Sequence, residues 1–178
     1  MRGMRTPLIA ALLCAAIGSA HAFERVSAIY GQGDSVDVFS IEAGSGDWKR
    51  WQVGESWRLW AYGMGSVGYW RAREHTEHKE LYDFAAAPVL RLQRARGAVA
   101  TPYLEASFGA HLLSRRHING NREFSTAFQF GEFVGAGLLF GRREDFGVGV
   151  RLQHVSNGGI KNPNPGLTFT GLVLHYQF

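Results

Sequence analysis

Two residues that could act as a base and a nucleophile stand two positions apart in the segment "RLQHVSNGGIKNPNPG", residues 151–166. The residues before His154 and Ser156 alternate between apolar and polar types, as in a β-strand. On a strand, residues i and i+2 point to the same side with Cα atoms roughly 6.5 Å apart, a gap that an imidazole and a hydroxymethyl group can close. The spacing predicts a base–nucleophile pair for ester chemistry. The alternative is a solvated polar pair at a strand end.

The face that carries this pair makes catalysis more plausible than the spacing alone. His154 and Ser156 share their parity with Val148, Val150 and Leu152. If that apolar face meets lipid, a polar pair without a task is costly there. The other strand histidines, His111 and His175, fall on the opposite, polar parity.

The elements that must position the pair follow from a period-two pattern that recurs after residue 22. The expected strands are 25–33, 35–47, 55–71, 80–94, 100–114, 127–140, 146–157 and 167–178. This pattern predicts an all-β fold, an eight-stranded antiparallel transmembrane β-barrel with apolar residues outside. A soluble barrel is the alternative, but it would need an outer face rich in Lys and Glu, and Lys is scarce.

The polar faces of these strands carry mid-strand charges that a membrane barrel would turn inward and pair. They are Arg58, Arg91, Glu105 and Arg151. Aromatic residues gather where the strands end, as interfacial girdles do. These are Trp48, Trp51, Trp57, Tyr69 and Trp70.

Loop lengths predict the orientation of the barrel. The connections 48–54, 95–99 and 141–145 are short, as periplasmic turns are, whereas 72–79, 115–126 and 158–166 are long, as extracellular loops are. With this orientation, His154 and Ser156 lie near the outer end of their strand and face the lipopolysaccharide leaflet.

Residues 1–22 have the features of a secretory signal peptide: two arginines, a short apolar run and an Ala20-His21-Ala22 cleavage site. Residues 23–178 are then one barrel domain without cysteine, because Cys14 lies in the signal segment. The formal charge of +4 becomes +2 without Arg2 and Arg5 (17 basic minus 15 acidic residues), which gives no reason to expect nucleic acid binding.

At "HVSNGGIKNPNPG", together with "FQFGEFVGAGLLFG", the signal peptide and the aromatic C-terminus, the sequence resembles the PagL family of outer-membrane lipid A deacylases. The resemblance implies hydrolysis of the ester-linked 3-hydroxyacyl chain at the 3-position of lipid A. It also implies Ser156 as nucleophile, His154 as general base, Asn164 in the oxyanion hole and Phe130 beside the site. Asn157 belongs to the same motif.

The motif departs from the family at Thr168, where the family's orienting acid would stand. A threonine can accept a hydrogen bond from the imidazole but carries no charge. Glu132 is our candidate for a substitute acid: it shares the outward parity of its strand, and pairing Phe140 with Val148 would put it opposite Ser156 and diagonal to His154. The alternative for Glu132 is a carboxylate that reaches water or a loop arginine.

The function that we expect is an outer-membrane lipid A 3-O-deacylase, with backbone N–H groups of "SNGG" and the Asn164 amide holding the oxyanion. The alternatives are an outer-membrane phospholipase-type acyl hydrolase and a non-enzymatic lipopolysaccharide-binding barrel. The chemistry requires no metal and no cofactor, and a homodimer is left open. Two outer-loop clusters have bland explanations as well as functional ones: His75 and His78 as a solvated loop rather than a metal site, and Arg115, Arg116 and Arg122 as loop charge or phosphate ligands.

Overall fold

The computed structural model describes residues 23–73, 79–95, 99–119 and 122–178, and the expected signal segment lies outside these ranges. Eight long strands run β1 (Arg25–Gly33), β2 (Val36–Val53), β3 (Trp57–Ala72), β4 (Glu80–Arg94), β5 (Ala100–Leu113), β8 (Phe128–Phe140), β9 (Phe146–Ser156) and β10 (Leu167–Gln177). Two short strands, β6 (His117–Ile118) and β7 (Arg122–Glu123), pair with each other between β5 and β8. Within the described residues, no helix is long and apolar enough to cross a bilayer.

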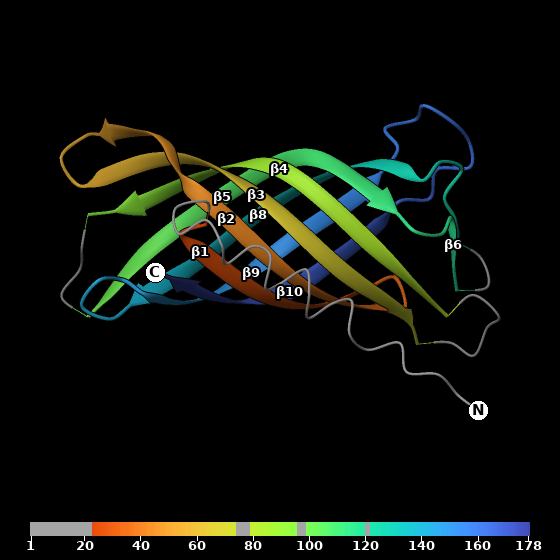
Figure 1. The fold of residues 1–178 in the computed structure, drawn as a ribbon, viewed down its shortest axis with the longest axis horizontal. Helices are drawn as coiled ribbons and strands as arrows, with labels where there is room; N and C mark the ends of the chain where they lie inside the picture. Colours follow the sequence, from red (N-terminus) through yellow and green to blue (C-terminus); the bar gives the residue numbers. More distant parts are fainter. Residues whose placement is uncertain (1–22, 74–78, 96–98, 120–121) are drawn as a thin grey trace.

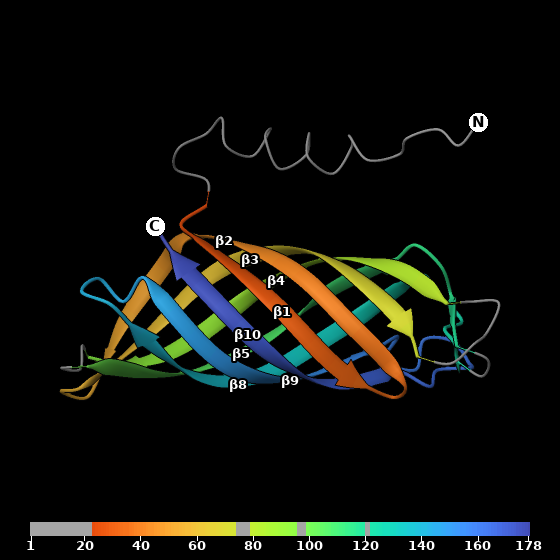
Figure 2. The ribbon, with the colours of Figure 1, turned by 90° about the horizontal axis from the view of Figure 1, so that it is seen from below.

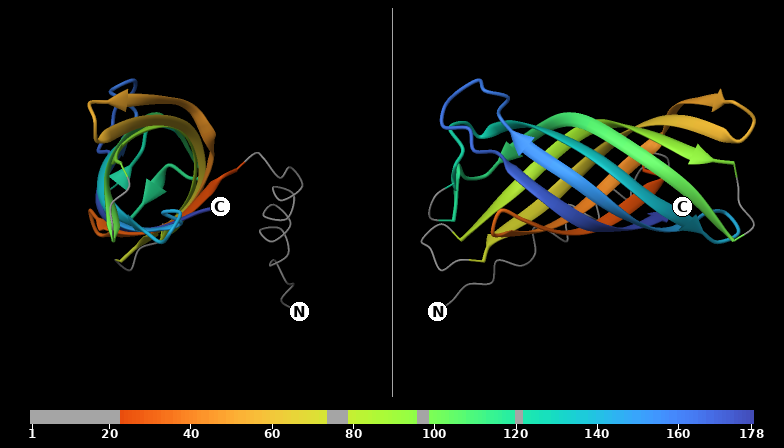
Figure 3. Two further views of the ribbon diagram at one scale, coloured as in Figure 1. Left: turned by 90° about the vertical axis from the view of Figure 1, so that its left-hand side faces the viewer. Right: turned by 180° about the vertical axis from the view of Figure 1, so that it is seen from behind.

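The eight long strands form one closed antiparallel barrel in which each strand pairs with its neighbours in the chain order (Figure 1). Closure is made by β1 and β10, which pair from Arg25 with Gln177 to Gln32 with Thr170 and lie side by side in Figure 2. Seen along its axis, the barrel is a complete ring (Figure 3, left). The predicted architecture is confirmed, and within the described residues each of the eight long strands has a partner on both sides.

Alternation sorts the side chains as the sequence predicts. Along β5, Leu104, Phe108 and Leu112 are more than half exposed, whereas Tyr103 and Glu105, on either side of Leu104, are buried in the barrel. Exposed large apolar side chains continue around the outside on the other strands, and this outer surface fits a membrane barrel and not a soluble one.

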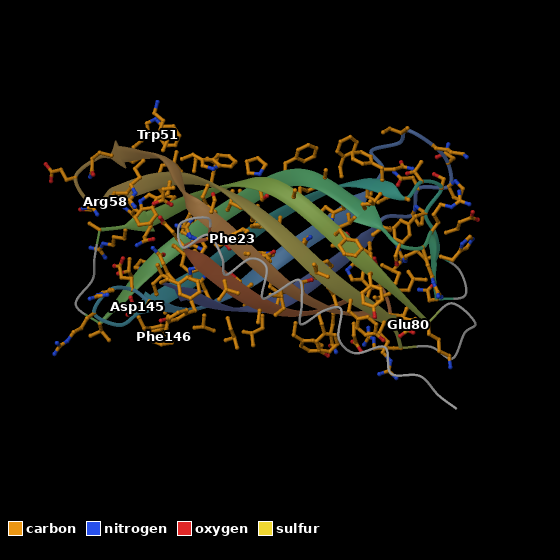
Figure 4. All side chains as sticks on the ribbon, viewed as in Figure 1. Phe23, Trp51, Arg58, Glu80, Asp145 and Phe146 are labelled. Carbon is orange, nitrogen blue, oxygen red and sulfur yellow. The ribbon has the colours of Figure 1, made fainter. Side chains whose placement is uncertain are left out.

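A network of charges fills the middle of the barrel. Arg91 pairs with Glu105 at 3.0 Å, and Arg151 pairs with Glu42 at 2.5 Å and with Glu105 at 3.4 Å. All four side chains are nearly inaccessible to solvent. The predicted inward pairing of Arg91, Glu105 and Arg151 is confirmed. The prediction for Arg58 is wrong, because this residue is exposed at the end of β3, near Trp51 (Figure 4).

Removing the shared carboxylate of this network is expected to destabilise the barrel strongly. In Glu105→Leu, the buried Arg91 guanidinium loses its one acidic partner among the described residues, and an unpaired buried charge costs about 3 to 5 kcal/mol of unfolding free energy. Urea unfolding of the protein in detergent measures this loss. Arg58→Leu removes an exposed charge and should change the unfolding free energy by less than about 0.5 kcal/mol. Equal stability of Glu105→Leu and the wild type would show that water screens the interior charges.

The predicted boundary between the second and third strands is also wrong. Residues 48–54 do not form a turn, because β2 continues to Val53 and pairs with Trp57 of β3, so that the turn is only residues 54–56. Register shifts between Gly44 and Lys49 break the alternation there, which is why the pattern seemed to end early. Of the aromatic residues assigned to the girdles, Trp48 is 63% exposed, but Trp70 is fully buried inside the barrel.

The outer end of the barrel is closed by an apolar cap. Ile118 of β6 and Phe124 after β7 are fully buried, and the Phe124 ring lies 6.3 Å from the Trp70 ring, centroid to centroid. Val155 of β9 and Leu167 of β10 belong to the same buried cluster. The cap therefore packs behind the two strand ends that carry the predicted catalytic residues.

Candidate active site

His154 and Ser156 lie at the end of β9, on the same parity as the exposed Val150 and Leu152, as the sequence predicts. This end of β9 lies beside the long loops (Figure 1). Both are half-buried, whereas Val155 between them points inward and is fully buried. The structure gives no hydrogen bond between these two described side chains. Such contacts in a site without substrate often tighten only when substrate binds.

The imidazole of His154 is held from the β10 side. Thr168 is its direct cross-strand partner, and His154 Nδ1 lies 2.7 Å from Thr168 Oγ1. When Nδ1 donates to this hydroxyl, Nε2 is left to accept a proton from a serine. Gly166 lies against the ring: a Cβ at this position would be 2.7 Å from His154 Cε1. Thr168 therefore contacts the histidine through an uncharged hydroxyl group.

Glu132 faces outward as predicted, but its register differs from the prediction. It lies directly opposite His154, and Phe130 is the residue opposite Ser156. The turn is tighter than expected, because Phe140 pairs with Phe146 and not with Val148, which moves every pair by two residues. No hydrogen bond joins the described side chains of Glu132 and His154.

Phe130 belongs to an aromatic cluster beside Ser156. Its ring stacks on Phe108 at 5.5 Å between centroids and meets Phe128 edge-on at 5.1 Å. Gly158 lies close to the Phe130 ring, because a Cβ at this position would be 3.2 Å from it. The cluster gives Ser156 an apolar flank on the β8 side.

The loop after Ser156 is held by Asn157, which is fully buried. Its Nδ2 donates to the carbonyl of Lys161 at 2.7 Å, and its Oδ1 accepts the Gly159 N–H at 2.9 Å. Its own N–H donates to Asn164 Oδ1 at 2.9 Å. Two of the backbone N–H groups expected for the oxyanion are thus engaged within the loop. The Gly158 N–H and Asn164 Nδ2 have no hydrogen-bond partner among the described residues.

Ser125 is a site residue that sequence analysis missed. Its hydroxyl donates to the Lys161 carbonyl at 2.7 Å and accepts from Asn157 Nδ2 at 2.8 Å, and its N–H donates to the Pro163 carbonyl at 3.3 Å. This serine therefore joins the β7–β8 segment to the loop between β9 and β10. No spacing in the sequence indicates a contact across 32 residues.

Of the two outer-loop clusters, His75 and His78 are predicted to be a solvated loop, and the cluster of Arg115, Arg116 and Arg122 to be either loop charge or phosphate ligands. Arg115 and Arg116 are exposed, and Arg116 donates to the Ser125 carbonyl at 3.3 Å. His75 and His78 lie outside the described residues. In the described part of the chain, no group of three or more His, Cys, Asp or Glu side chains could hold a metal ion.

Comparison with known proteins shows the family to which the chain belongs. The family model described as "Lipid A 3-O-deacylase (PagL)" matches residues 39–177. The lipid A deacylase PagL of Bordetella bronchiseptica is 31% identical over 94% of this chain and 91% of its own length. That of Pseudomonas aeruginosa is 30% identical over 90% and 89%. The crystal structure of the outer membrane enzyme PagL superposes with a TM-score of 0.74, at 29% identity, over 86% of this chain and 99% of its own. The chain is therefore a β-barrel of the outer membrane and belongs to the PagL family of lipid A 3-O-deacylases.

Proposed function

We propose that this protein removes the ester-linked 3-hydroxyacyl chain at the 3-position of lipid A, with Ser156 as nucleophile and His154 as general base. The observation that carries the proposal is the pair itself: a histidine with an anchored Nδ1 stands beside a serine on the outer surface of a membrane barrel. A lipid ester in the outer leaflet can reach this pair from the side. A reaction inside the barrel would instead require a path through the charge network.

The proposed reaction has two halves. His154 Nε2 takes the proton of Ser156 Oγ, which attacks the ester carbonyl carbon. When the tetrahedral intermediate collapses, the imidazolium returns the proton to the sugar oxygen, and the lipid leaves as an alcohol. His154 then deprotonates a water, which hydrolyses the acyl-serine and releases the 3-hydroxy acid.

Two donors on the loop after Ser156 are proposed to hold the oxyanion. They are Asn164 Nδ2, since Asn164 Oδ1 is already bonded to the Asn157 N–H, and the Gly158 N–H. A correctly placed donor of this kind contributes about 3 kcal/mol to the transition state. Asn157 itself has a supporting role, because its side chain is buried and fully engaged.

The aromatic cluster of Phe108, Phe128 and Phe130 is proposed to receive the start of the acyl chain. Below it on the outward faces of β8 and β9 come Val134 and Leu152, both more than half exposed. This seam leads from Ser156 toward the membrane centre over apolar surface, apart from Glu132. An acyl chain that follows it keeps its contact with hydrocarbon while its ester reaches the serine.

The proposal is tested with the purified full-length protein, lipid A vesicles and phospholipid vesicles, with mass spectrometry of the products. We expect lipid A to lose one 3-hydroxyacyl chain and phospholipid to stay intact. Cleavage of phospholipid but not lipid A would favour the phospholipase-type alternative. A folded barrel that cleaves neither would favour a binding protein.

The two neighbours of His154 should differ in their effect on catalysis. Thr168→Val removes the contact that fixes Nδ1 and is expected to lower kcat by about 100-fold, the lower end of general-base contributions. We propose that Glu132 acts only through its charge. Glu132→Gln is then expected to lower kcat about fivefold, equivalent to about 1 kcal/mol for a charge about 4 Å away in water-like surroundings. Initial rates on lipid A measure both variants.

A larger loss of kcat in Glu132→Gln than in Thr168→Val would assign the orienting role to Glu132, as the sequence analysis proposed. Undiminished activity of Glu132→Gln would remove this residue from the mechanism altogether. Thr170→Val is the matched control, because Thr170 lies on the same outward face of β10 but pairs with Leu152 instead of His154.

A further inference from the structure

Three segments far apart in the sequence meet where the chain enters β10. They are the β1–β2 turn with Asp34, strand β7 with Arg122, and residues 165–168. None of the functional motifs in the sequence includes Asp34. The contacts among them converge on the backbone next to His154.

Arg122 holds this backbone through its guanidinium group. Nη1 donates to the carbonyl of Gly166 and, at 3.4 Å, to that of Pro165. Nη2 lies 3.4 Å from Asp34 Oδ2, and the arginine side chain is only 18% exposed. The backbone N–H of Arg122 also donates to Asn119 Oδ1 at 3.0 Å, which fixes the start of the side chain. The arginine therefore binds acceptors of residues 165–166 and Asp34 at the same time.

Asp34 completes the connection from the opposite side. Its Oδ2 accepts the backbone N–H of Thr168 at 2.9 Å while facing Arg122. Thr168 is the residue whose hydroxyl contacts His154 Nδ1, and Gly166 is the residue against the imidazole ring. Asp34 and Arg122 thus fix both backbone positions that determine where the ring lies.

From this geometry we infer that Asp34 and Arg122 are positioning residues for His154, an inference that rests on the proposed function. Neither residue has a role in the chemical step. Their ion pair keeps residues 165–168 at the distance that holds the imidazole toward Ser156. Misplacing a catalytic group by about 1 Å can cost 100-fold in rate, so a loose segment here would be felt in catalysis.

The pair is better suited to positioning than to global stability or substrate binding. The Asp34 side chain is 39% exposed, and partly exposed ion pairs add little to folding free energy. As a ligand for a lipid A phosphate, Arg122 would have to share Nη1 and Nη2 with the protein acceptors that they already contact, and its Nε is buried. The opposite charges also offset each other at the imidazole, so the effect comes from geometry.

The test uses the purified full-length protein in detergent and measures kcat and KM on lipid A and on enzymatically dephosphorylated lipid A. The variants are Asp34→Asn, Arg122→Gln, the double variant and Arg122→Lys. Asp37→Asn and Arg73→Gln are the matched controls, because this second ion pair, 3.8 Å apart, also lies at the outer end. Heat-modifiable gel mobility reports whether each barrel has folded.

We expect each single variant to lower kcat about tenfold on both substrates, within the 100-fold range for a misplaced group, with KM within twofold of the wild type. The double variant should be no slower than the slower single one, because both changes release the same segment. Arg122→Lys should recover part of kcat, and the two control variants should match the wild type.

Three results would overturn the inference: unchanged kcat in folded Asp34→Asn and Arg122→Gln, additive losses in the double variant, or a rise in KM confined to phosphorylated lipid A. The last result would make Arg122 a phosphate ligand. If the variants do not fold, the pair is structural and the inference fails. The wild-type arm separates these results from failure of the proposed function, which would appear as intact lipid A in every sample.

Discussion

Replacing Ser156 with alanine is expected to lower kcat on lipid A by about 10⁴-fold or more, the loss seen when a serine hydrolase loses its nucleophile. Alanine keeps the strand and the half-buried surface but has no oxygen to form the acyl-enzyme. Mass spectrometry of lipid A from cells that express the variant should therefore show only the intact form. Because Ser156 is at the end of β9 and its neighbour Val155 supplies the packing, the barrel should fold normally.

A second variant shows whether the serine and histidine act as one unit. His154→Ala should cause a loss of similar size, and the double variant should be no worse than either single one. Ser107→Ala is the control: the hydroxyl of this serine on β5 donates to the Pro88 carbonyl of β4, and its loss should leave the rate unchanged. Substantial activity in Ser156→Ala would instead indicate direct attack by a water that His154 activates.

Gly166→Ala is expected to lower kcat by about 100-fold, through displacement of the His154 ring. The added Cβ would lie 2.7 Å from Cε1 and 3.1 Å from Nε2, closer than van der Waals contact allows. The ring cannot move freely, because Nδ1 is held by Thr168 on one side. The added Cβ would therefore displace His154 Nε2, the nitrogen that must take the serine proton. Single-turnover rates on lipid A measure the effect on the chemical step.

The effect of backbone strain on this variant can be measured separately by substituting alanine at a second glycine with a positive φ, Gly159. Gly166 has a φ of 60° and Gly159 a φ of 81°, so alanine costs about 1 kcal/mol of left-handed strain at either position. A Cβ at Gly159, however, meets nothing within 4 Å. We expect Gly159→Ala to share the small loss of stability and to keep nearly full activity. Equal activity losses in both variants would show that strain in the loop, and not contact with His154, is responsible.

The sequence contained most of the fold because alternation is a local property. Each strand of a membrane barrel shows its two faces in every second residue, so the outward position of His154 and Ser156 followed from Val150 and Leu152 alone. The predicted end of the second strand was wrong because the alternation breaks at the register shifts between Gly44 and Lys49 of β2.

Register could not be predicted with the same certainty, because it depends on turn geometry. The prediction paired Phe140 with Val148, whereas the structure pairs it with Phe146, so Glu132 was placed opposite Ser156 and not opposite His154. The predicted outward face of Glu132 was nevertheless correct. An error of two residues preserves the face and changes the partner. Only the three-dimensional structure therefore shows that His154 contacts Thr168 and not Glu132.

The supporting contacts of the site left no trace in sequence spacing. Asp34 is 134 residues from Thr168, and Ser125 is 32 residues from Asn157. A single acid in a turn or a serine in a loop matches no motif, because its contacts form only when the barrel closes and brings the loops together. The residues proposed for catalysis could be recognised in the sequence, and the residues proposed to hold them in place could not.

The packed interior of the barrel has a consequence for the cell envelope. Beside Arg91, Glu105 and Arg151, one interior cavity of about 10 Å³ has room for about one water molecule, and toward the outer end Ile118 and Phe124 are fully buried. We expect a barrel filled in this way to conduct ions and small solutes far less than a porin does, which single-channel conductance in planar bilayers would measure. The cell can therefore hold many copies of this protein, and remodel its surface widely, without weakening the permeability barrier that the outer membrane provides.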